Sequence, residues 1–387
     1  MDYLGIPETQ LEAAGGAWTA REIVQQPQVW ASVAAAIGRE SQSLQEFLGK
    51  LLKRKELRIV LTGAGTSAFV GECLAPALAR HSGMRVETIA TTDIVAGPEC
   101  LRSPGATLLL VSFARSGNSP ESVAAVNLAE KALGDCHHLI ITCNPEGALT
   151  RHARQLRSAK VVVLPDETND RGFAMTSSFT GMLLAATLIF GLPVDAAGGT
   201  AALTGLGREL LAIGVPIAGD FVHGAFTRVV YLGSKECKGL AREAALKMLE
   251  LSDGRVVALA ETALGFRHGP KTILDRHTLV IMFLSNDPYT RRYELDLLNE
   301  LRNDGVAGRV VAVTADGQPL PEHADAIRVS AGASATDLGL CFPYIILAQT
   351  FAFLQSLALG LTPDKPSAGG TVNRVVQGVS IHPWKPA

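Results

Sequence analysis

Residues 58–67 read RIVLTGAGTS, an apolar run that leads directly into glycine, alanine, threonine and serine. After Arg58 the run is continuously apolar, as strands are when a parallel sheet is covered on both faces. The same pattern returns in residues 228–235, which read RVVYLGSK. The chain therefore contains a buried strand that ends in a turn, and it uses this unit twice.

Two more strand-like runs recur in the same order. TLLLVSF begins at Thr107 and TLVIMFL begins at Thr278. LIITCN and VVAVTA place their threonines at Thr142 and Thr314. The three pairs of runs are offset by 170, 171 and 172 residues. A nearly constant offset over three runs in order indicates an internal duplication.

The segments between these runs predict helices. Residues 67–83, for example, read SAFVGECLAPALARHSG, with apolar residues at helical spacing and a glycine at the end. Strands that alternate with helices predict an α/β protein with two tandem doubly wound domains, each built on a parallel sheet. The Ala- and Gly-rich residues 195–205 are expected to connect the two domains. We expect an N-terminal helical segment packed outside the first sheet, a first domain, a second domain and a loop-like tail, over residues 1–54, 55–195, 206–361 and 362–387.

Composition and charge exclude several classes of protein. The chain has 387 residues, 47% of them hydrophobic, and a formal net charge of -2. No basic block is present, so we expect no nucleic-acid partner. Residues 1–16 lack the basic and apolar regions of a signal peptide, which predicts a cytoplasmic protein.

Two uncharged segments and six cysteines need separate interpretation. Residues 174–194 and 338–363 are long enough to span a bilayer, but polar residues, glycine or proline interrupt both. We expect buried helices and no membrane partner. The cysteines form no C-x-x-C pair, so they are interpreted as small buried hydrophobes rather than disulfides or zinc ligands.

Small polar residues follow three strands of the first half. The loops read GAGTS at 63–67, SFARSGNSPES at 112–122 and TNDRGFAMTSS at 168–178. Ligands of doubly wound sheets lie at the carboxyl ends of the strands. Glycines allow close approach of the backbone, and N–H groups at helix starts hold anions together with hydroxyls. Three such loops predict an anion site that suits a phosphate.

Two other interpretations of these loops are open. Each loop by itself is equally typical of ordinary helix capping by serine or threonine. Residues 63–68 also fit the dinucleotide fingerprint G-x-G-x-x-A, with Glu87 near the expected distance. Glu87, however, sits inside a strand-like run, and the fingerprint leaves the other two loops unexplained.

The second half offers acid–base residues in place of these loops. Glu243, Lys247 and Glu250 recur at i, i+4 and i+7 and share one face of a predicted helix. His268 follows in the sequence FRHGP at 266–270. A carboxylate can move a proton between adjacent carbons, and an imidazole can open a hemiacetal ring. A solvated salt-bridge face with a structural histidine explains the spacing equally well.

On these residues the chain resembles the sugar isomerase (SIS) domain family. The matching motifs are GAGTS at 63–67, ARSGNS at 114–119, MTSSFT at 175–180, ALKMLE at 245–250 and FRHGP at 266–270. The resemblance covers almost the whole chain. It implies two tandem SIS domains and an oligomeric enzyme, a homodimer or a larger assembly. It also implies a sugar-phosphate substrate and no metal or organic cofactor.

The resemblance also implies roles for individual residues. Glu250 is expected to shuttle a proton between C1 and C2 of the sugar, beside Lys247, and His268 is expected to open the ring, often from a neighbouring subunit. The substrate phosphate is expected to contact Thr66, Ser67, Ser116 and Ser119, with Gly65, Arg115 and Asn118 in the same loops. Residues expected to line the substrate are Thr176, Ser177, Asn373 and Arg374.

The chain departs from the amidotransferases of this family at both ends. It begins Met1-Asp2-Tyr3 without their glutaminase domain, and Asn373-Arg374 stands nearest to their imine-forming tail lysine. Arginine cannot form that imine. Both differences favour ammonia release. Its length and tail resemble the deaminases and isomerases of galactosamine-6-phosphate, so we expect that substrate to give tagatose-6-phosphate and ammonia. Glucosamine-6-phosphate deamination, plain aldose–ketose isomerisation and a non-catalytic sensor are the alternatives.

Overall fold

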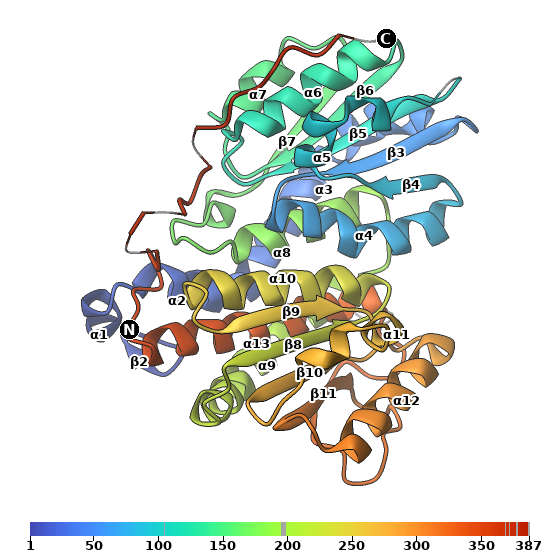
Figure 1. The fold of residues 1–387 in the computed structure, drawn as a ribbon. Coiled ribbons are helices and arrows are strands. Elements are labelled where there is room, and N and C mark those ends of the chain that lie inside the picture. The colour runs from blue at the N-terminus through green and yellow to red at the C-terminus, as the bar shows by residue number, and fades with distance from the viewer. Residues whose placement is uncertain (104, 195–198, 368, 371, 377, 386–387) are drawn as a thin grey trace. The chain divides into compact units, whose positions relative to one another are not determined.

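The computed structural model describes residues 1–103, 105–194, 199–367, 369–370, 372–376 and 378–385 (Figure 1). Contacts group the chain into two units. The first-sheet unit comprises Val29–Asp170, Ser177–Leu192 and Val372–Ala387. The second-sheet unit comprises Met1–Gln28, Arg171–Thr176 and Pro193–Thr371.

Each unit contains one five-stranded parallel sheet (Figure 1). The first has the order β4-β3-β5-β6-β7 and the second β9-β8-β10-β11-β12, so the two sheets have the same topology. This confirms the predicted fold class of two doubly wound domains. The first-sheet strands are β3 (Leu57–Thr62), β4 (Arg85–Thr88), β5 (Thr107–Ala114), β6 (Cys136–Thr142) and β7 (Ala159–Val163). The second-sheet strands are β8 (Arg228–Gly233), β9 (Val257–Glu261), β10 (Thr278–Phe283), β11 (Arg309–Ala315) and β12 (Ala326–Val329).

Strand pairing repeats between the sheets in the same register. Leu57 pairs with Thr107 in the first sheet, and Arg228 pairs with Thr278 in the second. Both members of the pair are thus shifted by 171 residues. Strands β3, β5 and β10 are buried at every position. Their continuous apolar sequence therefore reflects burial on both faces.

Helices follow the strands in both units. In the first half they are α4 (Thr66–Ser82), α5 (Thr91–Ala96), η1 (Pro98–Leu101), α6 (Pro120–Ala132), α7 (Ala148–Ala153), η2 (Asp166–Thr168) and α8 (Ser177–Ile189). In the second half they are α9 (Gly199–His223), α10 (Glu236–Leu251), α11 (Ala263–Phe266), η3 (Pro270–Ile273), α12 (Pro288–Asp304) and α13 (Asp337–Ala358). Helix α9 begins inside the predicted connection, of which residues 195–198 lie outside the described residues.

The N-terminal segment does not pack as a whole on the first sheet. It forms β1 (Asp2–Tyr3), β2 (Ile6–Pro7), α1 (Glu8–Ala13), α2 (Ala17–Val24) and α3 (Gln26–Leu51), and its first 28 residues belong to the second-sheet unit. Two long-range contacts explain this. The Asp364 carboxylate accepts hydrogen bonds from the backbone N–H and hydroxyl of Thr19, and Gln26 donates to the Gln349 side chain over 2.7 Å.

Among the residues that the structure describes, two helices are long and apolar enough to cross a membrane by length and composition alone, α9 and α13. The apolar window of α13 is 94% buried inside the structure, and that of α9 is 33% buried. Helix α13 packs on α9 and α10 within the second-sheet unit. It is therefore a core helix, as its polar interruptions predicted. Helix α8 is likewise buried from Ser177 to Thr187.

Candidate active site

The order in which strands are added to the first sheet reverses between β3 and β5. The chain moves outward from β3 to β4 on one side and from β5 to β6 and β7 on the other. Thr62 and Ser112 pair at the carboxyl ends of these two central strands. The segments that follow Thr62 and Ala114 therefore leave the sheet side by side at its switch point, where doubly wound sheets bind ligands.

The turn after β3 has glycine at two positions where a side chain is disfavoured. Gly65 has φ 54° and ψ -128°, a conformation that side chains disfavour. A Cβ on Gly63 would come within 2.5 Å of the Ser67 backbone. No side chain caps α4, whose first two residues are Thr66 and Ser67, both buried. The backbone and hydroxyl groups at this helix start have the composition of an anion site.

The loop after β5 is held in shape by its own side chains. Ser119 caps α6 by accepting a hydrogen bond from the Ser122 N–H, and the Ser116 hydroxyl accepts one from the Asn118 N–H. The Asn118 side chain in turn accepts from the Ala148 N–H over 2.9 Å. The capping interpretation is thus correct for Ser119. Because the Ser119 hydroxyl is used as a helix cap, Thr66, Ser67 and Ser116 are the main candidates for phosphate contact.

Arg115 connects this loop to the C-terminal tail. Its guanidinium is buried and donates to the Arg374 carbonyl over 2.7 Å, and the Arg374 guanidinium donates to the Asp170 carbonyl. The tail residues Asn373 and Arg374, which are separated from the loop by more than 250 residues, therefore lie near it. Further along the tail, Trp384 packs against the apolar core of the same unit. Arg115 therefore joins the loop after β5 to the tail.

The third predicted loop differs from the other two. The buried Asp170 carboxylate accepts hydrogen bonds from the Ser177 and Ser178 N–H groups at the start of α8, over 3.1 and 2.9 Å. A carboxylate already occupies the position that an anion would take, and its charge opposes a phosphate. Thr176 and Ser177 are fully buried. Of the three predicted loops, only the one after β3 leads into a helix, α4, that no side chain caps.

The equivalent switch point of the second sheet is filled by the protein itself. Lys235 has φ 54° and ψ -121°, nearly the conformation of Gly65, so the duplicated turn persists with a side chain added. Asp337 accepts from the Asn286 N–H, and Glu294 accepts from the Ser285 N–H, each over 2.7 Å. These carboxylates occupy the backbone donors that would otherwise bind an anion. The loop after β10 therefore offers fewer backbone donors to an anion than the loop after β5.

Helix α10 carries the predicted acid–base residues. The Lys247 ammonium lies 2.5 Å from Glu250 and 3.4 Å from Glu243. The side chains of Lys247 and Glu243 are fully buried, whereas that of Glu250 is 23% exposed. A buried charged triad is not a solvated salt-bridge face, so that alternative is wrong. Glu250 is the member of the triad that a ligand can reach.

His268 lies on the turn between α11 and η3 and is exposed. Thr262 caps α11, and buried Phe266 anchors the turn in the core. On either side of the histidine, Arg267 and Lys271 both pair with Glu300 of α12. The turn is therefore held at both ends while it presents an imidazole to solvent.

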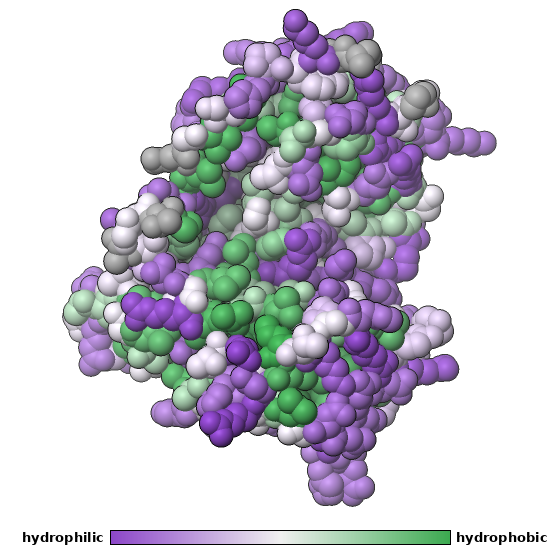
Figure 2. Space-filling view, viewed as in Figure 1, coloured by the Kyte–Doolittle hydropathy of each residue, from purple (hydrophilic) through white to green (hydrophobic). Residues whose placement is uncertain are grey.

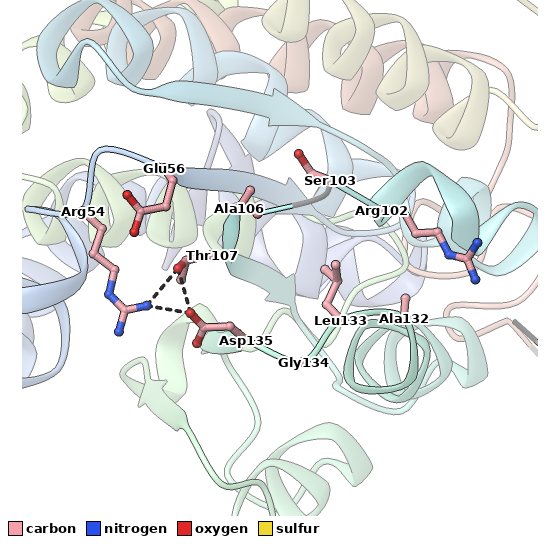
Figure 3. A pocket seen from close by; sticks show the side chains of 11 residues that line it. Arg54, Glu56, Arg102, Ser103, Ala106, Thr107, Ala132, Leu133, Gly134 and Asp135 are labelled. Carbon is pink, nitrogen blue, oxygen red and sulfur yellow. Dashed lines mark hydrogen bonds and ion pairs between the residues drawn. The ribbon is translucent and has the colours of Figure 1, made fainter.

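One pocket of about 710 Å³ lies away from these residues (Figure 3). It opens at the amino end of β5, whereas the anion loops follow the carboxyl ends. Arg54 donates to both Thr107 and Asp135, and Thr107 donates to Asp135 (Figure 3). The hydrogen bond from Thr107, together with Arg54, lowers the pKa of Asp135. The pocket is lined by none of the predicted site residues, and three of its polar residues, Arg54, Thr107 and Asp135, are hydrogen-bonded to one another.

The two parallel sheets define a class of protein with two tandem doubly wound α/β domains. The SIS domain profile matches residues 51–191 and 226–359, and the chain belongs to this family. It is 46% identical over 382 residues to D-galactosamine-6-phosphate deaminase AgaS of Escherichia coli. That alignment covers 97% of this chain and 98% of that protein. The chain is 42% identical to the protein of the same name from Shewanella sp. strain ANA-3, over 97% of this chain and 94% of that one.

A solved structure gives the same relationship. The tagatose-6-phosphate ketose/aldose isomerase of Escherichia coli superposes with a TM-score of 0.85 at 43% sequence identity. The match covers 97% of this chain and 98% of that chain. The resemblance found in the loops and in α10 therefore extends over the whole length of the protein.

Proposed function

We propose that this chain is a deaminating isomerase that converts D-galactosamine-6-phosphate and water to tagatose-6-phosphate and ammonia. Its near-full-length relatives carry the names of such enzymes. The observation that carries the mechanism is the triad on α10, in which two members are fully buried and Glu250 alone is partly exposed. A carboxylate fixed by a buried ammonium has a defined position and remains accessible to a substrate, which suits a proton-transfer base.

Phosphate binding is assigned to the open switch point of the first sheet. Thr66 and Ser67 supply hydroxyls and helix-start N–H groups, and Ser116 supplies a hydroxyl from the neighbouring loop. Such a site holds a dianion without a fixed cation beside it. The closed switch point of the second sheet, with Asp337 and Glu294 on its donors, supports this choice.

The chemistry requires one proton base and one water molecule. His268 assists opening of the pyranose ring, which exposes the C1 aldehyde. Glu250 removes the C2 proton while the C1 oxygen gains a proton, giving a 2-amino-1-enol. Return of a proton to C1 converts this enol to a C2 ketimine with a C1 hydroxyl. Water adds to C2 and ammonia leaves, so the products are the ketose phosphate and ammonia.

Plain aldose–ketose isomerisation is the second candidate, because the solved relative is named a ketose/aldose isomerase. The same base and proton path serve both reactions, and only the hydrolytic step differs. The chain is an enzyme, as its near-full-length relatives are, which excludes a non-catalytic sensor. Ammonia release from galactosamine-6-phosphate and glucosamine-6-phosphate, measured beside isomerisation of tagatose-6-phosphate, distinguishes the candidates. The proposal requires faster ammonia release from galactosamine-6-phosphate than from glucosamine-6-phosphate, and it fails if neither amino sugar is consumed.

The active form is proposed to be a homodimer or larger assembly in the cytoplasm. Figure 2 shows apolar surface over α10 and β9 of the second-sheet unit. The exposed apolar side chains include Leu249 of α10, which is 37% exposed, and Val257 of β9, which is 49% exposed. Leu264 of the following helix α11 is 45% exposed. Strand β9 is also an edge of its sheet. An exposed apolar surface beside an edge strand is typical of a surface that a second copy covers.

A further inference from the structure

Three potential metal ligands meet in the first-sheet unit, outside the residues assigned to the reaction. Glu130 lies near the end of α6, and Cys136 and His138 lie on β6. The His138 Nε2 atom is 2.7 Å from a Glu130 carboxylate oxygen and 3.4 Å from the Cys136 sulfur. All three ligand atoms lie within 4.8 Å of one another.

The local structure explains why these side chains converge. Residues two apart in a strand point to the same face of a sheet, so Cys136 and His138 share a face. Helix α6 packs on β6 and directs Glu130 to that face. The His138 side chain is fully buried, whereas Glu130 is 37% exposed. The cluster is therefore fixed on the strand side and open to solvent on the helix side.

The distances match a tetrahedral zinc site. With a Zn–S bond of about 2.3 Å and a Zn–N bond of about 2.0 Å, tetrahedral angles place sulfur and nitrogen about 3.5 Å apart. The observed separation of Cys136 and His138 is 3.4 Å. The oxygen of Glu130 would move from 2.7 Å to about 3.3 Å from the imidazole. A partly exposed glutamate can make this small movement.

Binding of a metal to these three side chains would release one proton, that of the Cys136 thiol. To bind a metal, the Cys136 thiol must lose its proton and the His138 imidazole must be neutral. A metal displaces the thiol proton to solvent, and the imidazole proton moves from Nε2 to Nδ1. The shift breaks no bond at Nδ1, and the N–H formed there has no acceptor among the described residues.

We propose that Glu130, Cys136 and His138 form a binding site for a zinc-like divalent transition metal, with water as the fourth ligand. Sulfur and imidazole ligands select zinc over magnesium or calcium. The ion would link the end of α6 to β6. The same helix begins at Pro120, after the Ser116 loop and about 15 Å from Glu130. We expect a metal that stabilises the unit and takes no part in the proton transfer.

The direct test is titration of the full chain with Co²⁺ and Zn²⁺ after treatment with a chelator. A thiolate bound to Co²⁺ gives a sulfur-to-metal charge-transfer band in the near ultraviolet. We expect this band to saturate at one equivalent, Zn²⁺ to displace the Co²⁺, and affinity to increase with pH because a proton is released. Absence of a saturable band at one equivalent would overturn the proposal.

Three variants and one control assign the site. In Cys136→Ser the band should be lost, and in Glu130→Gln and His138→Gln affinity should fall at least about tenfold. Cys100→Ser, which changes another partly buried cysteine of the same unit, should leave binding unchanged. Binding that survives in Cys136→Ser places the metal elsewhere and overturns the proposal. Glu130→Gln changes an exposed side chain, so its result stands even if the buried variant His138→Gln fails to fold.

Discussion

The ammonium of Lys247 lies 2.5 Å from the carboxylate of Glu250, one helical turn further along α10. Glu243 lies on the other side of the same ammonium, at 3.4 Å. Because Lys247 and Glu243 are fully buried, removal of the lysine would leave a buried carboxylate without this cation.

Lys247→Met tests this relationship. The variant should lose about 3–5 kcal/mol of unfolding free energy, because breaking a buried ion pair leaves an uncompensated charge. The double variant Glu243→Gln/Lys247→Met should recover part of that loss. Urea unfolding of both proteins measures the difference. Equal stability of the wild-type protein and the single variant would contradict a buried triad.

Phosphate contact at the first switch point predicts an effect on substrate binding. Ser67→Ala and Ser116→Ala should each raise KM by about 5- to 150-fold, equivalent to about 1–3 kcal/mol for a charged hydrogen bond, with a smaller change in kcat. Ser234→Ala, at the turn after β8, is the matched control and should leave KM unchanged. Steady-state ammonia release measures all three. An effect of the control as large as that of Ser67→Ala would argue against the assignment.

Stability should decrease as pH rises through neutrality, and Glu294 is the reason. Burial raises the pKa of Glu294 to about 7, from an ordinary value of 4.5. The folded state therefore holds this proton more tightly than the unfolded state does. The resulting stabilisation is complete below the unfolded pKa and is lost as pH rises to about 7 and above.

Glu294→Gln isolates this contribution. Gln cannot titrate but can still accept the hydrogen bond from the Ser285 N–H. Between pH 5 and 8 the wild-type protein should lose about 2 kcal/mol relative to the variant. Urea unfolding at several pH values gives the comparison. Parallel pH profiles for the two proteins would show that Glu294 does not titrate in this range.

The proposed assembly predicts complementation between inactive subunits. If His268 serves the site of a neighbouring subunit, mixed Glu250→Gln and His268→Ala proteins should regain activity that neither has alone. Each homogeneous protein, taken through the same mixing procedure, is the control. A fully active monomer in analytical ultracentrifugation would refute the assembly.

Local sequence patterns were sufficient for the fold and for part of the site. The apolar runs after Arg58 and Arg228 predicted both sheets, because burial on both faces demands such runs. The turn at Gly65 was predicted from the glycines that follow the first apolar run. The shared helix face of Lys247 and Glu250 was predicted from their spacing. Each of these features depends on residues close together in the chain.

Contacts between distant residues could not be predicted in this way. Arg115 meets the Arg374 carbonyl across 259 positions, and Gln26 meets Gln349 across 323. The latter contact helps to place the N-terminal helices with the second sheet. Asp170 caps α8 from seven positions before it, so the serine-rich start of that helix resembled an open anion site. A sequence pattern does not reveal which donors a distant carboxylate already occupies.

The central claim is that Glu250 moves the C2 proton. Exchange of the C2 hydrogen of galactosamine-6-phosphate with deuterium from solvent, followed by NMR, tests it most directly. Glu250→Gln keeps the size and hydrogen-bonding capacity of the side chain but removes its basicity. The account predicts that exchange slows by about two to four orders of magnitude while substrate binding is largely retained. Exchange by the variant at close to the wild-type rate would contradict it and would move the search for the base to Glu243 or His268.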